Sequence, residues 1–162
     1  MTLIEIMAVL VIFAIASAIV LPQFGKHDDL TAASASRELV ADLAFAQSRA
    51  IATRKMLYVW FDPAAGKYRV LVSIDPPTLA RHPVSQAPYE VTLGDGPLGG
   101  VSIAAANFDG SATIAFDERG MPWSCGEGNA PMPLDHGEIL LKCGEITATL
   151  TISPVTGQIN VK

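Results

Sequence analysis

The feature that most limits how this chain can fold is its N-terminal run of apolar residues. Between Glu5 and Lys26 no side chain carries a charge. About 20 mostly apolar residues are enough for a helix to cross the hydrocarbon core of a bilayer. A helix that is apolar on every face must be buried, and an N-terminal one of this length is most simply buried in lipid. The run therefore predicts a transmembrane helix over residues 1–25.

Glu5 is the exception, because it places a carboxylate near the start of this run. An acid at bilayer depth costs about 2.5–3.5 kcal/mol on insertion scales, and such residues usually have a partner and a function. A cleaved signal peptide would begin with basic residues, but no Lys or Arg precedes the run. A plain membrane anchor leaves the acid unexplained. A self-assembling helix explains it if Glu5 meets a positive charge on a neighbouring copy, and the α-amino group of Met1 is the nearest candidate.

The N-terminus also resembles a known family. The word Thr-Leu-Ile-Glu at residues 2–5, the apolar run and Pro22 look like the mature N-terminus of type IV pilins and type II secretion pseudopilins. The resemblance implies that a prepilin peptidase cuts before Met1 and methylates the new amine. It also implies that Glu5 pairs with the terminus of another subunit during assembly. Met1 departs from the family, whose first residue is most often Phe. Pro22 is expected to kink the helix without ending it.

A second helix is predicted over residues 26–55. Leu39, Leu43, Ala46 and Ala50 recur at helical spacing, and the many alanines favour helix. Residues 39–51 also resemble a stretch of the H-type minor pseudopilins and their type IV pilus counterparts. The two helices together would make a rod of about 54 residues, roughly 80 Å long at 1.5 Å per residue.

From residue 56 onward the pattern alternates with a period of two, and turn residues multiply. This pattern predicts strands, which we expect at residues 56–61, 67–74, 89–93, 112–116, 138–143, 145–152 and 158–161. Residues 75–88 and 123–137 are expected to be irregular. The predicted fold is α+β and pilin-like, with a long N-terminal helix packed on an antiparallel sheet or sandwich. The assembly helix is residues 1–25, and the periplasmic head is residues 26–162, β-rich from residue 56.

The two cysteines, Cys125 and Cys143, allow one intramolecular disulfide. It would close a loop of about 19 residues, worth roughly 3 kcal/mol in the chain-entropy model. A disulfide needs an oxidising compartment such as the periplasm, which is where the pilin-like topology would place the head. We therefore expect a disulfide that pins the irregular loop onto the closing sheet. Two free buried thiols are the alternative.

Composition and motifs disfavour several other functions. The net charge of −5 and the scattered basic residues argue against a protein that mainly binds nucleic acid. His27, His82 and His136 lie in turn-rich segments without a nucleophile motif, and the cysteine spacing matches no zinc pattern. We therefore expect no enzyme activity, no metal and no cofactor.

By resemblance, the chain is expected to be a minor pseudopilin in the tip complex of a type II secretion pseudopilus. It would sit in the bacterial inner membrane with a single pass and a periplasmic C-terminal head. The implied partners are other minor and major pseudopilins, the prepilin peptidase, the inner-membrane assembly platform, the lipid bilayer and secreted substrates. Residues 75–88 and 121–137 are expected to form the partner-binding loop surface.

Two other functions were weighed. A minor pilin of a type IV pilus that captures DNA for natural transformation would need a basic C-terminal patch. The last forty or so residues offer mainly Lys142 and Lys162 against Glu138 and Glu145. A membrane-anchored enzyme or receptor lacks any recognisable arrangement of active-site residues.

Overall fold

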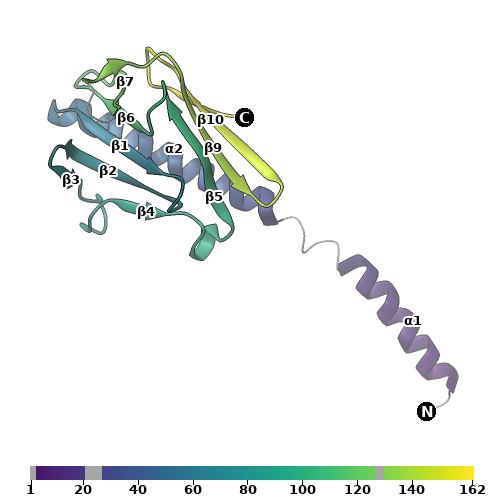
Figure 1. The fold of residues 1–162 in the computed structure, drawn as a ribbon. Helices are drawn as coiled ribbons and strands as arrows, with labels where there is room; N and C mark the ends of the chain where they lie inside the picture. Colours follow the sequence, from purple (N-terminus) through teal and green to yellow (C-terminus); the bar gives the residue numbers. More distant parts are fainter. Residues whose placement is uncertain (1–2, 21–26, 127–129) are drawn as a thin grey trace.

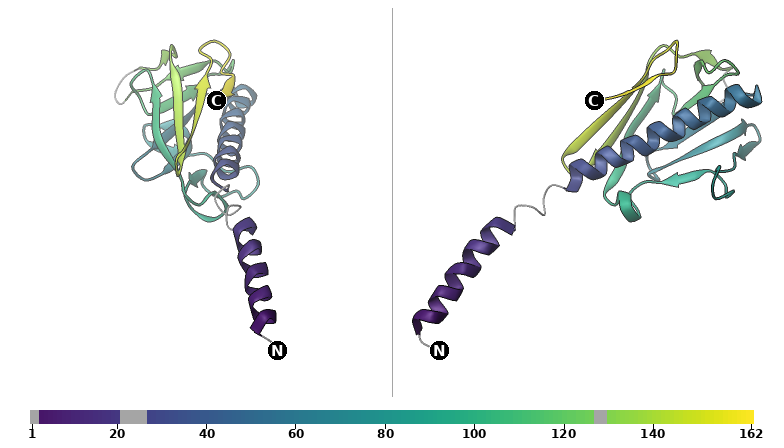
Figure 2. Two further views of the ribbon diagram at one scale, coloured as in Figure 1. Left: turned by 90° about the vertical axis from the view of Figure 1, so that its right-hand side faces the viewer. Right: turned by 180° about the vertical axis from the view of Figure 1, so that it is seen from behind.

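The computed structural model describes residues 3–20, 27–126 and 130–162, and it has two consecutive helices followed by a β-rich head (Figure 1). Helix α1 spans Leu3–Val20 and helix α2 spans His27–Thr53. Figures 1 and 2 show α1 projecting away from the head, whereas α2 lies along it. The predicted α+β architecture, with an N-terminal helical segment and an antiparallel β-rich head, is confirmed. The expected kink at Pro22 and the continuity of the rod concern residues outside the described ranges.

The strands form two antiparallel sheets. The larger sheet has the order β3-β2-β1-β6-β7-β8, with β4 also paired to β2, and the smaller sheet has the order β11-β10-β9-β5. The strands are β1 Leu57–Asp62, β2 Lys67–Ile74, β3 Pro77–Leu79, β4 Glu90–Thr92, β5 Val101–Phe108, β6 Thr113–Phe116, β7 Pro122–Ser124, β8 Met132–Pro133, β9 Gly137–Cys143, β10 Ile146–Ile152 and β11 Ile159–Val161. A short 3-10 helix, η2 Gly96–Leu98, precedes β5.

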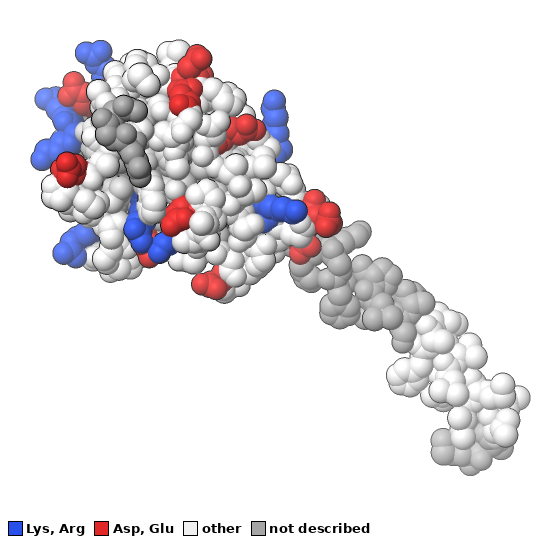
Figure 3. Space-filling model, in the orientation of Figure 1, with Lys and Arg blue, Asp and Glu red and all other residues white. Residues whose placement is uncertain are grey.

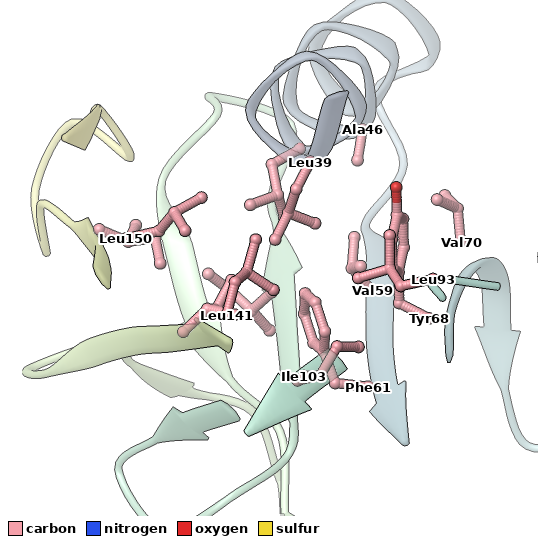
Figure 4. Packing of buried hydrophobic residues seen from close by; sticks show 14 of the residues in the cluster. Leu39, Ala46, Val59, Phe61, Tyr68, Val70, Leu93, Ile103, Leu141 and Leu150 are labelled. Carbon is pink, nitrogen blue, oxygen red and sulfur yellow. The ribbon is translucent and has the colours of Figure 1, made fainter. Parts of the chain in front are cut away.

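Helix α2 joins the two sheets by packing against both. It contacts β1 and β6 of the larger sheet and β5, β9 and β10 of the smaller one. In Figure 2 it runs the length of the head across both sets of strands. The predicted stripe is the buried face, because Leu39, Leu43, Ala46 and Ala50 are all 0% exposed. A single apolar face at helical spacing thus closes one core (Figure 4).

The strands supply the other side of this core through their alternation. In β1, Leu57, Val59 and Phe61 point inward and are at most 2% exposed. The two strands predicted at residues 56–61 and 67–74 form an antiparallel hairpin, since β1 pairs with β2 through residues 58–62 and 67–71. In β10, Ala148, Leu150 and Ile152 are buried, while the threonines between them are exposed or half-buried. The side of β10 that carries the threonines is therefore the outer one.

Several strands lie where none was predicted. β5 is the longest of them, and a register irregularity between Ile103 and Ala105 breaks its alternation. β3, β7 and β8 fall in the segments expected to be irregular, and each has only two or three residues. Strands this short that also contain proline carry little sequence signal, whether at the sheet edge, as β3 and β8 are, or one strand in from it, as β7 is.

The predicted disulfide between Cys125 and Cys143 is not present in this fold, where both are free, buried thiols. Ser124, next to Cys125, donates through Oγ to the carbonyl of Phe108, and Phe108 pairs with Gly137 at the start of β9. Cys143 ends the same strand, six residues on, which is about 20 Å at 3.3 Å per residue. A disulfide needs Cα atoms about 4.4–6.8 Å apart.

Candidate assembly surfaces

Helix α1 presents an apolar surface that the rest of the chain does not cover. Ten large apolar side chains between Leu3 and Ile15 are exposed, from 45% at Val9 to 78% at Leu3. The core cluster contains none of the described residues of α1. Soluble monomers rarely expose a contiguous apolar patch larger than a few hundred Å². This surface therefore needs a covering from outside the chain.

Glu5 lies in the first turn of α1, on the exposed surface. A carboxylate at that position is favoured by the partial positive charge of the helix N-terminus. Met1 lies outside the described residues, so its pairing with Glu5 stays a prediction. In the part of the chain that the structure describes, no helix combines the length and the apolar character needed to span a membrane.

Within the head, the β-rich part is held to α2 by a carboxylate that sequence reasoning did not single out. Asp42 accepts hydrogen bonds from the hydroxyls of Tyr68 at 2.5 Å and Tyr89 at 2.8 Å. Tyr68 lies in β2 and Tyr89 just before β4, and both are at most 2% exposed. Burial, and next the Asp42 charge, raises the pKa of Tyr68 far above its ordinary value. Burial and the Asp42 hydrogen bond raise the pKa of Tyr89. These hydroxyls therefore stay protonated donors.

A second polar tie runs from α2 to two turns at the far end of the head. The Gln47 side-chain amide donates to the carbonyls of Gly120 and Thr156, each at 2.8 Å. A Cβ added at Gly157, whose φ is +68°, would lie 2.7 Å from Nε2 of Gln47. Gly157 is thus required for both its backbone angle and the close approach of this amide. Gln47 lies in the segment that resembles H-type pseudopilins, and this tie gives a glutamine there a structural role.

The two loops expected to form one partner surface do not lie together. Residues 75–88 adjoin β3 and residues 121–137 contain β7 and β8, so they occupy opposite ends of the strand order in the larger sheet. Five strand spacings separate β3 from β8, or about 24 Å at 4.8 Å each. Residues 127–129 of the second loop lie outside the described ranges. Each loop is therefore a separate surface.

The loop at residues 80–88 is ordered by its own hydrogen bonds. His82 Nδ1 accepts from the backbone N–H groups of Val84 and Ser85, at 3.2 and 3.3 Å. The His82 ring meets Tyr89 edge-on, with centroids 4.7 Å apart. Val84 is left 85% exposed at the tip. His82 therefore shapes this loop.

His136 lies in a different part of the head, 3.6 Å from Glu138. His82 and His136 thus occupy separate loops, in line with the prediction that they are loop residues. Asp109 accepts the backbone N–H groups of Asp135 and His136, each at 2.8 Å, so it is a turn-stabilising residue.

Comparisons with known proteins place this geometry in a family. A search of curated proteins finds no relative with significant sequence similarity. Two crystal forms of the type IV minor pilin FimU of Pseudomonas aeruginosa share the fold. One has 17% sequence identity and a TM-score of 0.51, covering 81% of this chain and 87% of that chain. The other has 16% identity and a TM-score of 0.48, covering 80% and 90%.

A family match covers the head from α2 to the last turn. Residues 35–156 match the family described as type II transport protein GspH. This range contains the buried stripe of α2, Asp42 with both of its tyrosines, and Gln47 with both of its turns. Since the match spans well over half of the sequence, the chain belongs to the GspH family of type II transport proteins.

Proposed function

We propose that this chain is a minor pseudopilin, a structural subunit of the tip complex of a type II secretion pseudopilus. The observation that carries the proposal is the contrast within the molecule. The head closes its own core, while α1 leaves ten large apolar side chains exposed around and after the acid at position 5. Family membership supports assembly with other pilin-like subunits.

In this proposal α1 and the residues after it form a single-pass anchor in the inner membrane, and the head lies in the periplasm. A prepilin peptidase would cut before Met1 and methylate the new amine. During assembly, α1 helices would leave the lipid and pack together. Glu5 would neutralise the amine of a neighbouring subunit, which favours one register because a misplaced acid would stay unpaired in an apolar surrounding.

The test uses variants of Glu5 in the full chain. Glu5→Ala or Glu5→Val should leave the thermal unfolding of the head unchanged and impair co-purification with partner pseudopilins and protein secretion. Glu145→Ala, an exposed acid in the turn after β9, is the matched control and should behave as wild type. Normal co-assembly and secretion by the Glu5 variants would refute this role.

The alternative is a minor pilin of a type IV pilus, which the shared fold with FimU keeps in view. Complementation separates the two, because a pseudopilin restores secretion in a secretion mutant and a pilin restores pili in a pilus mutant. For the DNA-capturing form, a gel-shift assay at low and moderate salt is decisive. Binding that weakens steeply as salt rises would support it.

A further inference from the structure

The end of the head farthest from α1 carries a small surface hollow, which is separate from the exposed face of α1 and from the hydrophobic core. It has a volume of about 420 Å³ and is lined by Ile51, Arg54, Glu118 and Arg119. The first two come from the end of α2 and the other two from the turn between β6 and β7. In Figure 3, Lys and Arg side chains gather at the end of the head away from α1.

Contacts within the chain hold both walls of the hollow, the turn between β6 and β7 and the end of α2, in place. Asp117 Oδ1 accepts the backbone N–H groups of Arg119 and Met121, at 2.8 and 2.9 Å, which shapes the turn. Gln47 ties the same turn to α2 through the carbonyl of Gly120. Ile51 packs so closely on Gly120 that a Cβ there would lie 2.8 Å from its Cδ1. A preorganised site loses less entropy on binding.

Arg54 is an unusual residue for its position. Its backbone N–H donates to the carbonyl of Ile51, and the N–H of Lys55 donates to the carbonyl of Ala50. This pair of hydrogen bonds is the Schellman pattern of a helix end. The residue at this position usually is glycine, because φ is positive, and here Arg54 has a φ of +50°. A strained non-glycine residue that also lines a hollow indicates a use for its side chain.

The lining carries two arginines against one acid, Glu118. Within the described residues neither Arg54 nor Arg119 forms a salt bridge, although Arg119 lies close enough to the Asp117 carboxylate to interact with its charge. Ile51, which lines the same hollow as the two arginines, is 48% exposed. Guanidinium groups bind carboxylates with charge-assisted hydrogen bonds, and an exposed apolar side chain favours an apolar neighbour.

We propose that this hollow docks an acidic segment of a partner protein, with one carboxylate held by Arg54 and Arg119 and an adjacent apolar side chain packed on Ile51. Gln47 ties the turn that lines the hollow and the turn at residues 153–157 to the same point of α2, and Val155 on the second turn is 70% exposed. The inference rests on the proposed function, because it gives the head of a filament subunit the chemistry of one of its contacts.

The experiment measures binding of a fluorescent Leu-Glu-Leu-Asp peptide to the full chain in mild detergent, by anisotropy. The matching Leu-Gln-Leu-Asn amide is the uncharged probe. We expect the acidic peptide alone to bind, and its affinity to fall as salt rises. Arg54→Gln and Arg119→Gln should each weaken binding about tenfold. Arg37→Gln, an exposed arginine earlier on α2, is the control and should change nothing.

A second variant separates binding from folding. Arg54→Gly should relieve the positive-φ strain and raise the Tm by about 2–4 °C. It should also lower the affinity for the acidic peptide as much as Arg54→Gln does. Equal binding of the two peptides, equal losses in the Arg37 control, or full affinity in Arg54→Gly would overturn the proposal. The assay needs no assembly and leaves Glu5 intact, so its failure is distinct from failure of the Glu5 test.

Discussion

The two helices of this chain differ in whether the chain itself covers their apolar surface. In α2, Leu39 and Leu43 are fully buried against strands of the same molecule. In α1, Leu10 is 63% exposed and Phe13 is 67% exposed. The apolar face of α2 is covered by its own chain, whereas the apolar surface of α1 can be covered only by other molecules. Folding and assembly are therefore assigned to different helices.

Removing α1 gives the largest expected effect on assembly and almost none on folding. A chain that begins at residue 27 should lose co-purification with partner subunits entirely, yet its head should keep its Tm within about 2 °C. The reason is that the core cluster includes no described residue of α1. Circular dichroism and pull-down measure the two quantities. A head that unfolds without α1 would break the comparison.

Within the head, loss of Asp42 should have the largest effect on stability. Asp42→Ala removes the acceptor of two buried tyrosine hydroxyls, so unfolding should become easier by about 2–4 kcal/mol. Chemical denaturation measures this. Arg37→Ala, an exposed change on the same helix, should stay within about 0.5 kcal/mol. Similar values for the two variants would show that the tyrosine contacts do not hold α2.

Loss of the Gln47 tie should have a smaller effect. Gln47→Ala leaves the carbonyls of Gly120 and Thr156 without this donor, and we expect a loss of about 1–2 kcal/mol. Gly157→Ala should cost at least as much, because its Cβ meets the Gln47 amide at a positive φ. Ser48→Ala, exposed on α2, is the control. A wild-type denaturation midpoint for both variants would show that the Gln47 hydrogen bonds do not stabilise the head.

Alkaline pH should weaken the same contacts. The folded pKa values of Tyr68 and Tyr89 lie above their unfolded value of about 10, so the folded state holds these protons more tightly. Their stabilisation is complete below pH 10 and is lost as the pH rises beyond it. The Tm should therefore hold up to about pH 10 and fall between about pH 10 and pH 12. Tyr89→Phe should flatten that fall, and an unchanged slope would contradict the assignment.

The smallest effect concerns the thiols. Burial raises the pKa of Cys125 to about 11, so its reactive thiolate is scarce at neutral pH. With both thiols free, a reductant should shift the Tm by less than about 1 °C, and mass spectrometry should count two blocked thiols after alkylation of the unfolded chain. A large drop in Tm on reduction would show that the two cysteines form a disulfide after all.

The sequence predicted the parts of the head whose pattern is local. The stripe of α2 and the alternation of β1 and β10 each place apolar residues at one period, and the structure buries them. The Asp42 and Gln47 contacts could not be predicted, because their partners lie at least 26 residues away along the chain. The predicted disulfide is not present, because closeness in sequence does not set distance in the fold: Cys125 follows Ser124, which bonds Phe108 opposite the start of β9, and Cys143 ends that strand.

The most direct test of the central claim is the water accessibility of α1 in native membranes. Leu10→Cys and Val84→Cys, at 63% and 85% exposed in the single chain, would be labelled with a membrane-impermeant maleimide. We predict fast labelling at residue 84 and very slow labelling at residue 10, because other molecules cover α1. Equal rates at the two positions would show that α1 faces water and would contradict the account.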